Sequence, residues 1–171
     1  MNESIAVSTT GNTAGITAGI IAGNTAETPA GTPSGIRFDT KIAVLLRDDL
    51  AVWQRLNVTA FLVSGIGTAR PEVIGEAYQD ADDTRYLPEF RQPVLVFADG
   101  KEALVAAHAK ALSRGLAISV FTADMFGTGN DADNRAAVRA VRGADLDLVG
   151  IAVYGPKNAV DKAFKGAVMH P

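Results

Sequence analysis

The stretch "KIAVLLRDDLAVWQRLNVTAFLVSG", residues 41–65, decides what fold the rest of the chain can adopt. Its first part, Ile42–Leu46, is apolar without interruption, which is typical of a strand that is buried on both faces. The part from Val52 to Ile66 has the spacing of a helix instead. Between the two lies a charged corner, Arg47-Asp48-Asp49. In open α/β sheets, ligand sites form at such corners, where a strand hands over to a helix.

Three later segments repeat the pattern of a short, continuously apolar strand. They are rich in Val, Ile and Leu and cover Val94–Phe97, Leu116–Phe121 and Leu148–Val153. The first helix should present an apolar stripe made of Trp53, Leu56, Ala60 and Val63. Strands that alternate with helices predict an α/β fold, here a three-layer sandwich with the order β-α-β-α-β-α-β-α.

Local signals place the other three helices. The segment Asp99–Glu102 has capping-box spacing, and its helix should end at Arg114-Gly115. The third helix should open at Asp131 and Asp133 and close with Arg139 and Arg142 before Gly143, because the helix dipole favours acids first and bases last. Pro156 suits the first turn of the fourth helix.

The first 36 residues differ from the rest in composition. They are dominated by Thr, Gly and Ala, they repeat "GNTA" at Gly11–Ala14 and Gly23–Ala26, and they contain no Lys or Arg. Short side chains bury too little apolar area to offset the entropy of ordering the chain. We therefore expect residues 1–36 to form a disordered low-complexity tail, and residues 37–171 to form the folded domain.

Composition excludes several classes of function. The chain has no cysteine, which suits a cytoplasmic protein, and only two histidines, so a three-histidine zinc site is impossible. No apolar run reaches the roughly 18 residues that a membrane span needs. From Arg37 onward there are 16 basic and 17 acidic residues, a net charge of −1, which does not favour a nucleic acid as partner. No motif for a metal or a cofactor is present.

The charged corner supplies the first candidate site residues. Asp49 follows the first strand, and Asn57 shares a helical face with Trp53, Ala60 and Ser64. An amide within an apolar stripe needs hydrogen-bond partners if it is buried, so Asn57 could orient a loop or a ligand. The alternative is structural: Asp49 caps a turn or the helix, and Asn57 binds nearby backbone.

The second candidate is the loop "FTADMFGTGND" at residues 121–131, which follows the third strand. Asp124 could act as an acid, a base or a positioning group, and Thr122 and Thr128 beside it are candidate ligand contacts. The Gly127-Thr128-Gly129 segment could bring backbone amides near an anion. It lacks the Lys of a phosphate loop and the third Gly of a dinucleotide loop, so a plain flexible loop is the equal alternative.

The third candidate is the acidic run "DADDTR" at residues 80–85. A calcium loop counted from Asp80 would require Glu at its twelfth position, where this chain has Arg91, so a solvated loop is favoured. The segment from Arg70 to Gln92 is long and poor in regular signals, which is also typical of a lid or a dimer contact. His108 lies between apolar residues of the second helix, and a structural role is favoured over a catalytic one.

Three stretches carry a resemblance to a known superfamily: "KIAVLLRDDL", "QPVLVFADGKEALVAAHAKALSRGLAISVFTAD" and "LVGIAVYGPKNAVDKAFKG". Over residues 41–166 the chain resembles the peptidyl-tRNA hydrolase II superfamily. It is more similar to the domain-of-unknown-function 2000 family, through "WQRLNVTAFLVSG" and "GIAVYGPKNAVDK". The resemblance implies a four-stranded mixed sheet of order 2-1-4-3 with the last strand antiparallel. It also implies a homodimer.

The residues that the hydrolases use are mostly missing from this chain, so the resemblance does not extend to their function. The hydrolases carry a lysine-rich turn before the first helix and a histidine within it, whereas this chain has Arg55 in the turn and Val63 near the histidine position. Arg55 could still hold a ligand, although a guanidinium differs from an ammonium in geometry. We therefore expect a small-ligand-binding or regulatory module without peptidyl-tRNA hydrolase activity. The alternative is an ester or amide hydrolase that uses the same cleft, with Asp49, Asn57 and Asp124 as candidate catalytic residues.

Overall fold

A computed structural model of the chain describes residues 37–170, so the predicted tail lies outside the described residues. Nine regular elements follow one another: β1 Thr40–Arg47, α1 Val52–Ala69, β2 Val94–Asp99, α2 Lys101–Ser113, β3 Ala117–Thr122, α3 Asp131–Arg139, β4 Leu148–Pro156, α4 Lys157–Ala163 and β5 Val168–Met169. Short 3₁₀ turns, η1 Pro71–Val73, η2 Ala123–Gly127 and η3 Gly143–Asp145, join some of them. The alternation of strands and helices confirms the predicted α/β class.

One sheet of five strands, ordered β3-β4-β1-β2-β5, forms the centre of the domain. β1 and β2 run parallel, and β4 runs antiparallel to both β1 and β3. The prediction of four strands is wrong, because β5 adds antiparallel to β2 through the pairs Phe97↔Met169 and Ala98↔Val168. A strand of two residues is too short to leave a hydrophobic pattern in the sequence.

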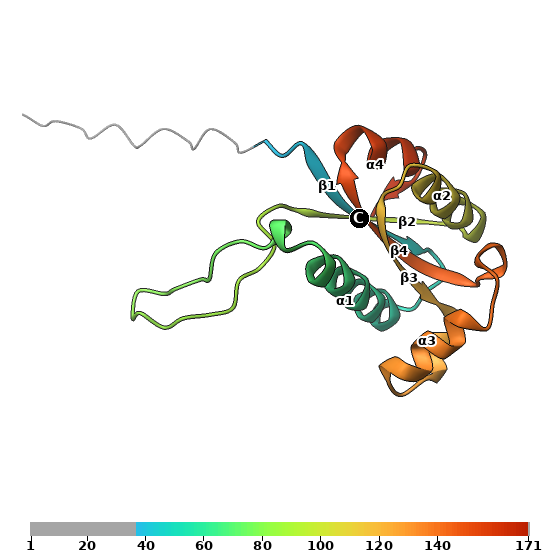
Figure 1. Ribbon diagram of the computed structural model, residues 1–171, viewed down its shortest axis with the longest axis horizontal. Helices are drawn as coiled ribbons and strands as arrows, with labels where there is room; N and C mark the ends of the chain where they lie inside the picture. The colour runs from blue at the N-terminus through green and yellow to red at the C-terminus, as the bar shows by residue number, and fades with distance from the viewer. Residues whose placement is uncertain (1–36, 171) are drawn as a thin grey trace, which may run out of the picture. The chain divides into compact units, whose positions relative to one another are not determined.

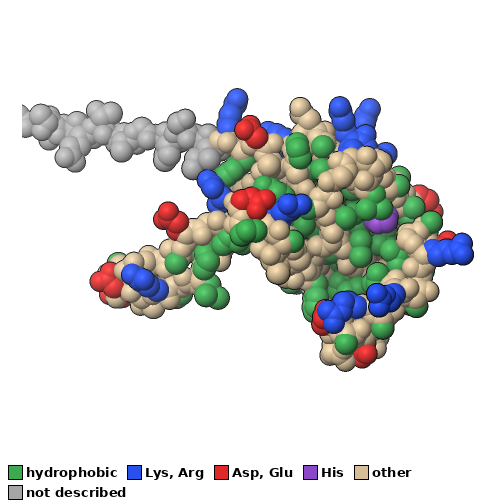
Figure 2. Space-filling view, viewed as in Figure 1, with side chains coloured by type: hydrophobic (Ala, Val, Ile, Leu, Met, Phe, Trp, Pro, Cys, Tyr) green, Lys and Arg blue, Asp and Glu red, His purple; other side chains and the backbone are tan. Residues whose placement is uncertain are grey.

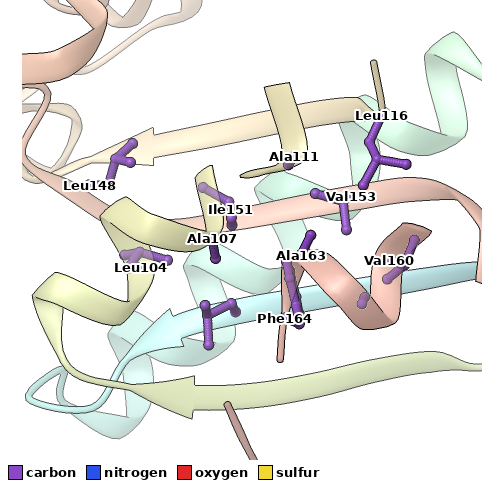
Figure 3. Close-up of a cluster of buried hydrophobic side chains, with 12 residues drawn as sticks. Leu104, Ala107, Ala111, Leu116, Leu148, Ile151, Val153, Val160, Ala163 and Phe164 are labelled. Carbon is purple, nitrogen blue, oxygen red and sulfur yellow. The ribbon is translucent and has the colours of Figure 1, made fainter. Parts of the chain in front are cut away.

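β1 separates two apolar layers because its side chains alternate between the two faces of the sheet. Ala43 and Leu45 face a core formed with α2 and α4, which is drawn in Figure 3. Ile42, Val44 and Leu46 face a second core, formed with α1. The ribbon view shows α2 and α4 on one side of the strands and α1 on the other (Figure 1), so the sheet lies between two helical layers.

Several helix ends differ from the sequence prediction. The Asp99 side chain accepts a hydrogen bond from the neighbouring N–H of Gly100 at 2.8 Å and does not cap α2, whose N-cap is Gly100. α3 is capped by Asn130 and ends at Arg139, before Arg142. Pro156 is the N-cap of α4 and precedes its first turn. Each shift is a residue or a few, and none moves a helix to another layer.

α1 contacts the sheet through a different face from the one predicted. Val58, Leu62 and Ile66 are its buried residues, whereas Trp53 is 63% exposed and Leu56 is exposed as well. The close approach depends on Gly150 of β4: a Cβ atom there would lie 2.7 Å from Val58 Cγ1 and 3.0 Å from Leu62 Cδ1. Of the predicted stripe, Val63 packs partly against this core, whereas Trp53, Leu56 and Ala60 are exposed.

An extended segment, residues 75–91, leaves the domain between η1 and β2. We call it the arm; the ribbon view shows it projecting away from the sheet and helices (Figure 1). Its base is a bridge between Ile74 and Phe90, and a second bridge joins Gln79 to Arg85 near the tip.

Within residues 37–170, no helix is long and apolar enough to cross a membrane.

Candidate functional site

The charged corner after β1 is closed by ion pairs from distant parts of the chain. The Arg47 guanidinium donates to Asp49 at 2.6 Å and to Asp147 at 3.2 Å. Asp147 also pairs with Lys101, whose Nζ lies 2.8 Å from the same oxygen. Arg47 is the last residue of β1, Asp147 directly precedes β4, and Lys101 begins α2, so segments distant in sequence meet at one end of the central strands. Within the corner, Arg47 and Asp49 are therefore paired, and Arg47 is also tied to Asp147.

Arg55 is held by the backbone of the same corner. Its Nε donates to the carbonyl of Leu50 at 2.9 Å, and its Nη2 donates to the carbonyl of Asp48 at 2.5 Å. Its Nη1 lies 3.1 Å from Nε2 of His170, which follows β5. A guanidinium that already bonds two carbonyls and a ring nitrogen has few donors left for a ligand. Arg55 thus fastens the β1–α1 turn.

Two titratable groups show perturbed pKa values for different reasons. The hydrogen bond from Lys101, with the nearby positive charge, lowers the pKa of Asp147 against the opposing effect of partial burial. Burial lowers the pKa of His108, which is 8% exposed on the sheet side of α2. Both are consistent with structural roles, an ion pair and a packed neutral ring.

The loop after β3 is built by short-range contacts. Thr122 is buried, and its backbone N–H lies 3.4 Å from the sulfur of Met125. Its hydroxyl has no hydrogen-bond partner within residues 37–170. The Thr128 hydroxyl lies 2.9 Å from the carbonyl of Met125 and also contacts the Asn134 side chain. Asp124 points outward and is exposed.

A groove with a volume of about 1180 Å³ lies between α1 and α3. One wall is a stripe of α1 in which Trp53, Asn57, Phe61 and Ser64 follow at helical spacing. At 1.5 Å per residue this stripe is about 16 Å long. The remaining lining comes from the edge strand β3, the turn η2, residues 128–130 and the length of α3.

Aromatic rings are the largest apolar side chains in the lining of the groove. Trp53 meets Phe126 edge-on with ring centroids 5.8 Å apart, and Phe126 lies 5.1 Å from Phe121. Phe61 meets Phe121 edge-on at 5.8 Å. Trp53 and Phe61 are 63% and 52% exposed, so about half of each side chain remains available to a ligand. Rings in such contact hold one another in place without filling the groove.

The structure divides the predicted site residues among three places. Asn57 and Thr128 line the groove. Asp49 and Arg55 belong to the closed corner, and Thr122 and Asp124 lie in the loop outside the groove lining. Asn57 is exposed, so its amide is not a buried polar group that requires partners within the fold. The face it shares with Trp53 and Ser64 was predicted correctly, but that face opens on the groove.

Sequence reasoning missed Phe61 and Phe126, which complete the aromatic wall. A signal for Phe61 was present, since α1 is apolar on more than one side and a helix needs only one apolar stripe to contact a sheet. Phe126 lies in the short turn η2, where no periodic pattern indicates which way a ring faces. Within residues 37–170, no group of three or more His, Asp or Glu side chains could hold a metal ion.

One comparison with known proteins identifies a family. Residues 40–171 match the family model described as "Protein of unknown function (DUF2000)". The chain is also similar to the solved structure of a protein of unknown function, Atu0240 from Agrobacterium tumefaciens. The two are 47% identical with a TM-score of 0.76, over 79% of this chain and 100% of that chain. No curated protein matches the sequence significantly. Since the family model covers most of the chain, the protein belongs to the DUF2000 family.

Proposed function

We propose that this protein is a binding module that holds a small ligand in the groove between α1 and α3, without peptidyl-tRNA hydrolase activity. The observation that carries the proposal is the aromatic wall, in which Trp53 and Phe61 are more than half exposed and Trp53 packs against the partly buried Phe126. We further propose that the domain belongs to the peptidyl-tRNA hydrolase II-like superfamily. The order of its first four strands and the antiparallel β4 support that assignment.

The chemistry of the groove indicates the class of ligand. Ligand sites are commonly hollows of about 300–1,000 Å³ with an apolar lining and a few polar groups that fix orientation. Here the aromatic rings offer flat apolar contacts, the Asn57 amide can donate and accept hydrogen bonds, and the Thr128 hydroxyl, which already donates within the loop, can accept one. This combination suits a planar, largely apolar molecule that carries one or two hydrogen-bonding groups.

The lining gives less support to a hydrolase. Hydrolysis of an ester or amide needs an acid, base or nucleophile within hydrogen-bonding reach of the substrate. Among the described residues that line the groove, the one carboxylate is Asp131, and it pairs with Arg135 at 2.8 Å. Asp49 pairs with Arg47, and Asp124 lies outside the lining.

Trp53 allows a direct test, because it is the single tryptophan of the chain. We would titrate the full-length protein with the neutral probe N-phenyl-1-naphthylamine and record energy transfer from Trp53. Saturable transfer is expected, with a dissociation constant in the micromolar range. Phe126→Ala should weaken binding by about tenfold, since a lost aromatic contact of about 1.4 kcal/mol corresponds to that factor.

Leu112→Ala is the matched control, because Leu112 is an exposed apolar side chain on α2, on the other face of the sheet. It should leave the titration unchanged. Equal weakening by both substitutions, or transfer that never saturates, would contradict a groove site. The hydrolase alternative has its own assay: cleavage of blocked aminoacyl-tRNA that disappears in Asp124→Ala would refute the binding-only proposal.

A further inference from the structure

We propose that the arm of a second copy of this chain lies across the open side of the groove and completes it, with the two copies exchanging arms. This inference rests on the proposed function of the groove and adds its partner. The second copy would contribute Tyr86 and Leu87 to the site. Three independent features of the arm and of α3 carry the argument.

The first feature is the exposure of the arm. Residues 76–89 are exposed without exception, yet they include Tyr78, Tyr86 and Leu87, which are 54%, 54% and 85% exposed. The space-filling view shows the arm as a projection that carries apolar and charged side chains (Figure 2). An isolated two-stranded ribbon is marginally stable in water and needs a surface to pack against. Within residues 37–170, the arm has no such surface beyond its base.

The second feature is the defined structure of the tip. Asp80 accepts hydrogen bonds from the N–H groups of Asp82 and Thr84, each at 2.9 Å, and from the Tyr86 hydroxyl at 2.8 Å. The Tyr86 bond is the largest cause of the lowered pKa of Asp80. The N–H of Tyr86 also donates to the carbonyl of Tyr78 at 2.8 Å. A preformed tip loses less entropy when it binds a surface than a floppy loop would.

The third feature is complementary charge. Residues 75–91 contain five acidic and two basic residues, a net charge of −3, so two arms would repel each other. α3 and the residues after it offer Arg135, Arg139 and Arg142 at helical spacing, and the first two line the groove. Arg139 makes no ion pair within residues 37–170, whereas Arg135 is paired with Asp131. Opposite fields steer the arm towards α3 and away from another arm.

The arm is also longer than the α1 stripe of the groove that it would cover. Each leg has about eight residues, and extended chain rises about 3.3 Å per residue, so the arm spans about 26 Å. A two-fold axis would let each copy give its arm and receive the other's, which closes the assembly as a dimer. The exposed Leu87 would then cover the aromatic wall while the acidic tip lies along α3.

Sedimentation equilibrium of the full-length chain at micromolar concentration tests the dimer. Wild type should be dimeric, and Leu87→Asp should raise the dimer dissociation constant about tenfold or more, as for a central apolar contact. Arg139→Glu and Asp82→Arg should each weaken the dimer about fivefold. The double variant should recover to within about threefold of wild type, because the two charges exchange places. Lys165→Glu, beside α4 on the other face, is the matched control and should have no effect.

A wild-type chain that stays monomeric overturns the inference, and so does a dimer that Leu87→Asp leaves intact. Failure of the double variant to recover overturns the placement of the tip on α3. The naphthylamine titration separates this inference from the proposed function. A monomer that binds the probe refutes the exchanged arm alone, whereas a dimer that does not bind it refutes the ligand site and leaves the arm in place.

Discussion

The charged corner lies at the N-terminal end of α1 and the groove lies along the side of the same helix, and the two regions differ in how their side chains are engaged. In the corner, Arg47 and Lys101 are paired with carboxylates, and Arg55 is bonded to backbone carbonyls. In the groove, Trp53 and Phe61 keep about half of their surface open to solvent. The charged side chains Arg47, Asp49, Lys101 and Asp147 are therefore paired with one another, whereas the exposed rings of the groove are open to a ligand.

This difference shows where a binding site should be sought in such a fold. Polar side chains that meet others within the chain gain structure from the contact and lose availability. Large apolar side chains left in the open have no partner in the monomer, and clusters of them mark sites of interaction. The predictions that follow test whether the corner is structural and the groove is available.

The largest difference in the free energy of unfolding should be between the buried face of α1 and the face that lines the groove. Leu62→Ala removes a fully buried side chain and should lower the free energy of unfolding by about 2–5 kcal/mol. Its neighbour Phe61 is half exposed in the groove, so Phe61→Ala should cost about 1 kcal/mol or less. Urea denaturation of both variants measures the difference. Equal costs would mean that the groove wall is part of the core.

The next largest loss of stability should come from removing the hydrogen bonds that Arg55 donates to the β1–α1 turn. Arg55→Met keeps much of the aliphatic bulk but leaves the carbonyls of Leu50 and Asp48 without their donor. We expect a loss of about 1–2 kcal/mol, as for a charged hydrogen bond at a partly exposed position. Unchanged stability together with a loss of probe binding would instead make Arg55 a ligand contact. Arg114→Met, at an exposed helix end, is the control.

A smaller effect, which depends on pH, should come from the corner ion pairs. The pKa of Asp147 is lowered in the folded state, so its charged form stabilises the fold above the unfolded pKa of about 3.9. That contribution is lost as the pH falls through the lower, folded pKa. Because Asp147 is 43% exposed, solvent screening should keep it below about 1 kcal/mol. Asp147→Asn should therefore unfold at lower temperature at pH 7, and the two melting curves should converge near pH 2.

The smallest effect should be at Asn57. Its side chain is exposed in the groove, so Asn57→Leu should change stability by less than about 0.5 kcal/mol. Asn158→Leu, at an exposed position of α4, is a matched substitution on the other face. Only Asn57→Leu should alter the affinity of a ligand that needs its amide. A large loss of stability would restore the structural role that the sequence suggested.

Much of the fold could be predicted, because continuous apolarity identifies buried strands. β1 and β4 are central strands with core on both faces, and their sequences are apolar at nearly every position. β5 could not be predicted from the sequence, because it has only two residues, Val168 and Met169, that pair with β2. The strand order came from the resemblance to a superfamily, since no local pattern encodes which strands are neighbours.

The buried face of α1 could not be chosen from its sequence. Trp53, Leu56 and Ala60 form one apolar stripe and Val58, Leu62 and Ile66 form another, and both have helical period. The choice is made by β4, where the missing side chain of Gly150 admits Val58 and Leu62. That contact joins residues about ninety positions apart, so the sequence near α1 carries no sign of it.

The same limit applied to the candidate site. Asp48 and Asp49 stood out as charges at a strand end, which is where ligand loops occur. Asp49 pairs with Arg47, and Arg47 also pairs with Asp147, which is a hundred residues away in the sequence and gives no local signal of its proximity. Asn57 was placed on the correct face of α1, but whether that face met the core or the solvent depended on packing.

The position of β4 also bears on how the chain is made. β1 lies between β2 and β4, and Val44 pairs with Ala152, which is more than a hundred residues later in the sequence. At about 5–20 residues per second, a ribosome adds that length in about 5–20 seconds. During that interval the nascent chain has a helix, α1, whose apolar side has no completed sheet to contact. Chaperones that bind exposed apolar segments should therefore bind the nascent chain before β4 has been synthesised.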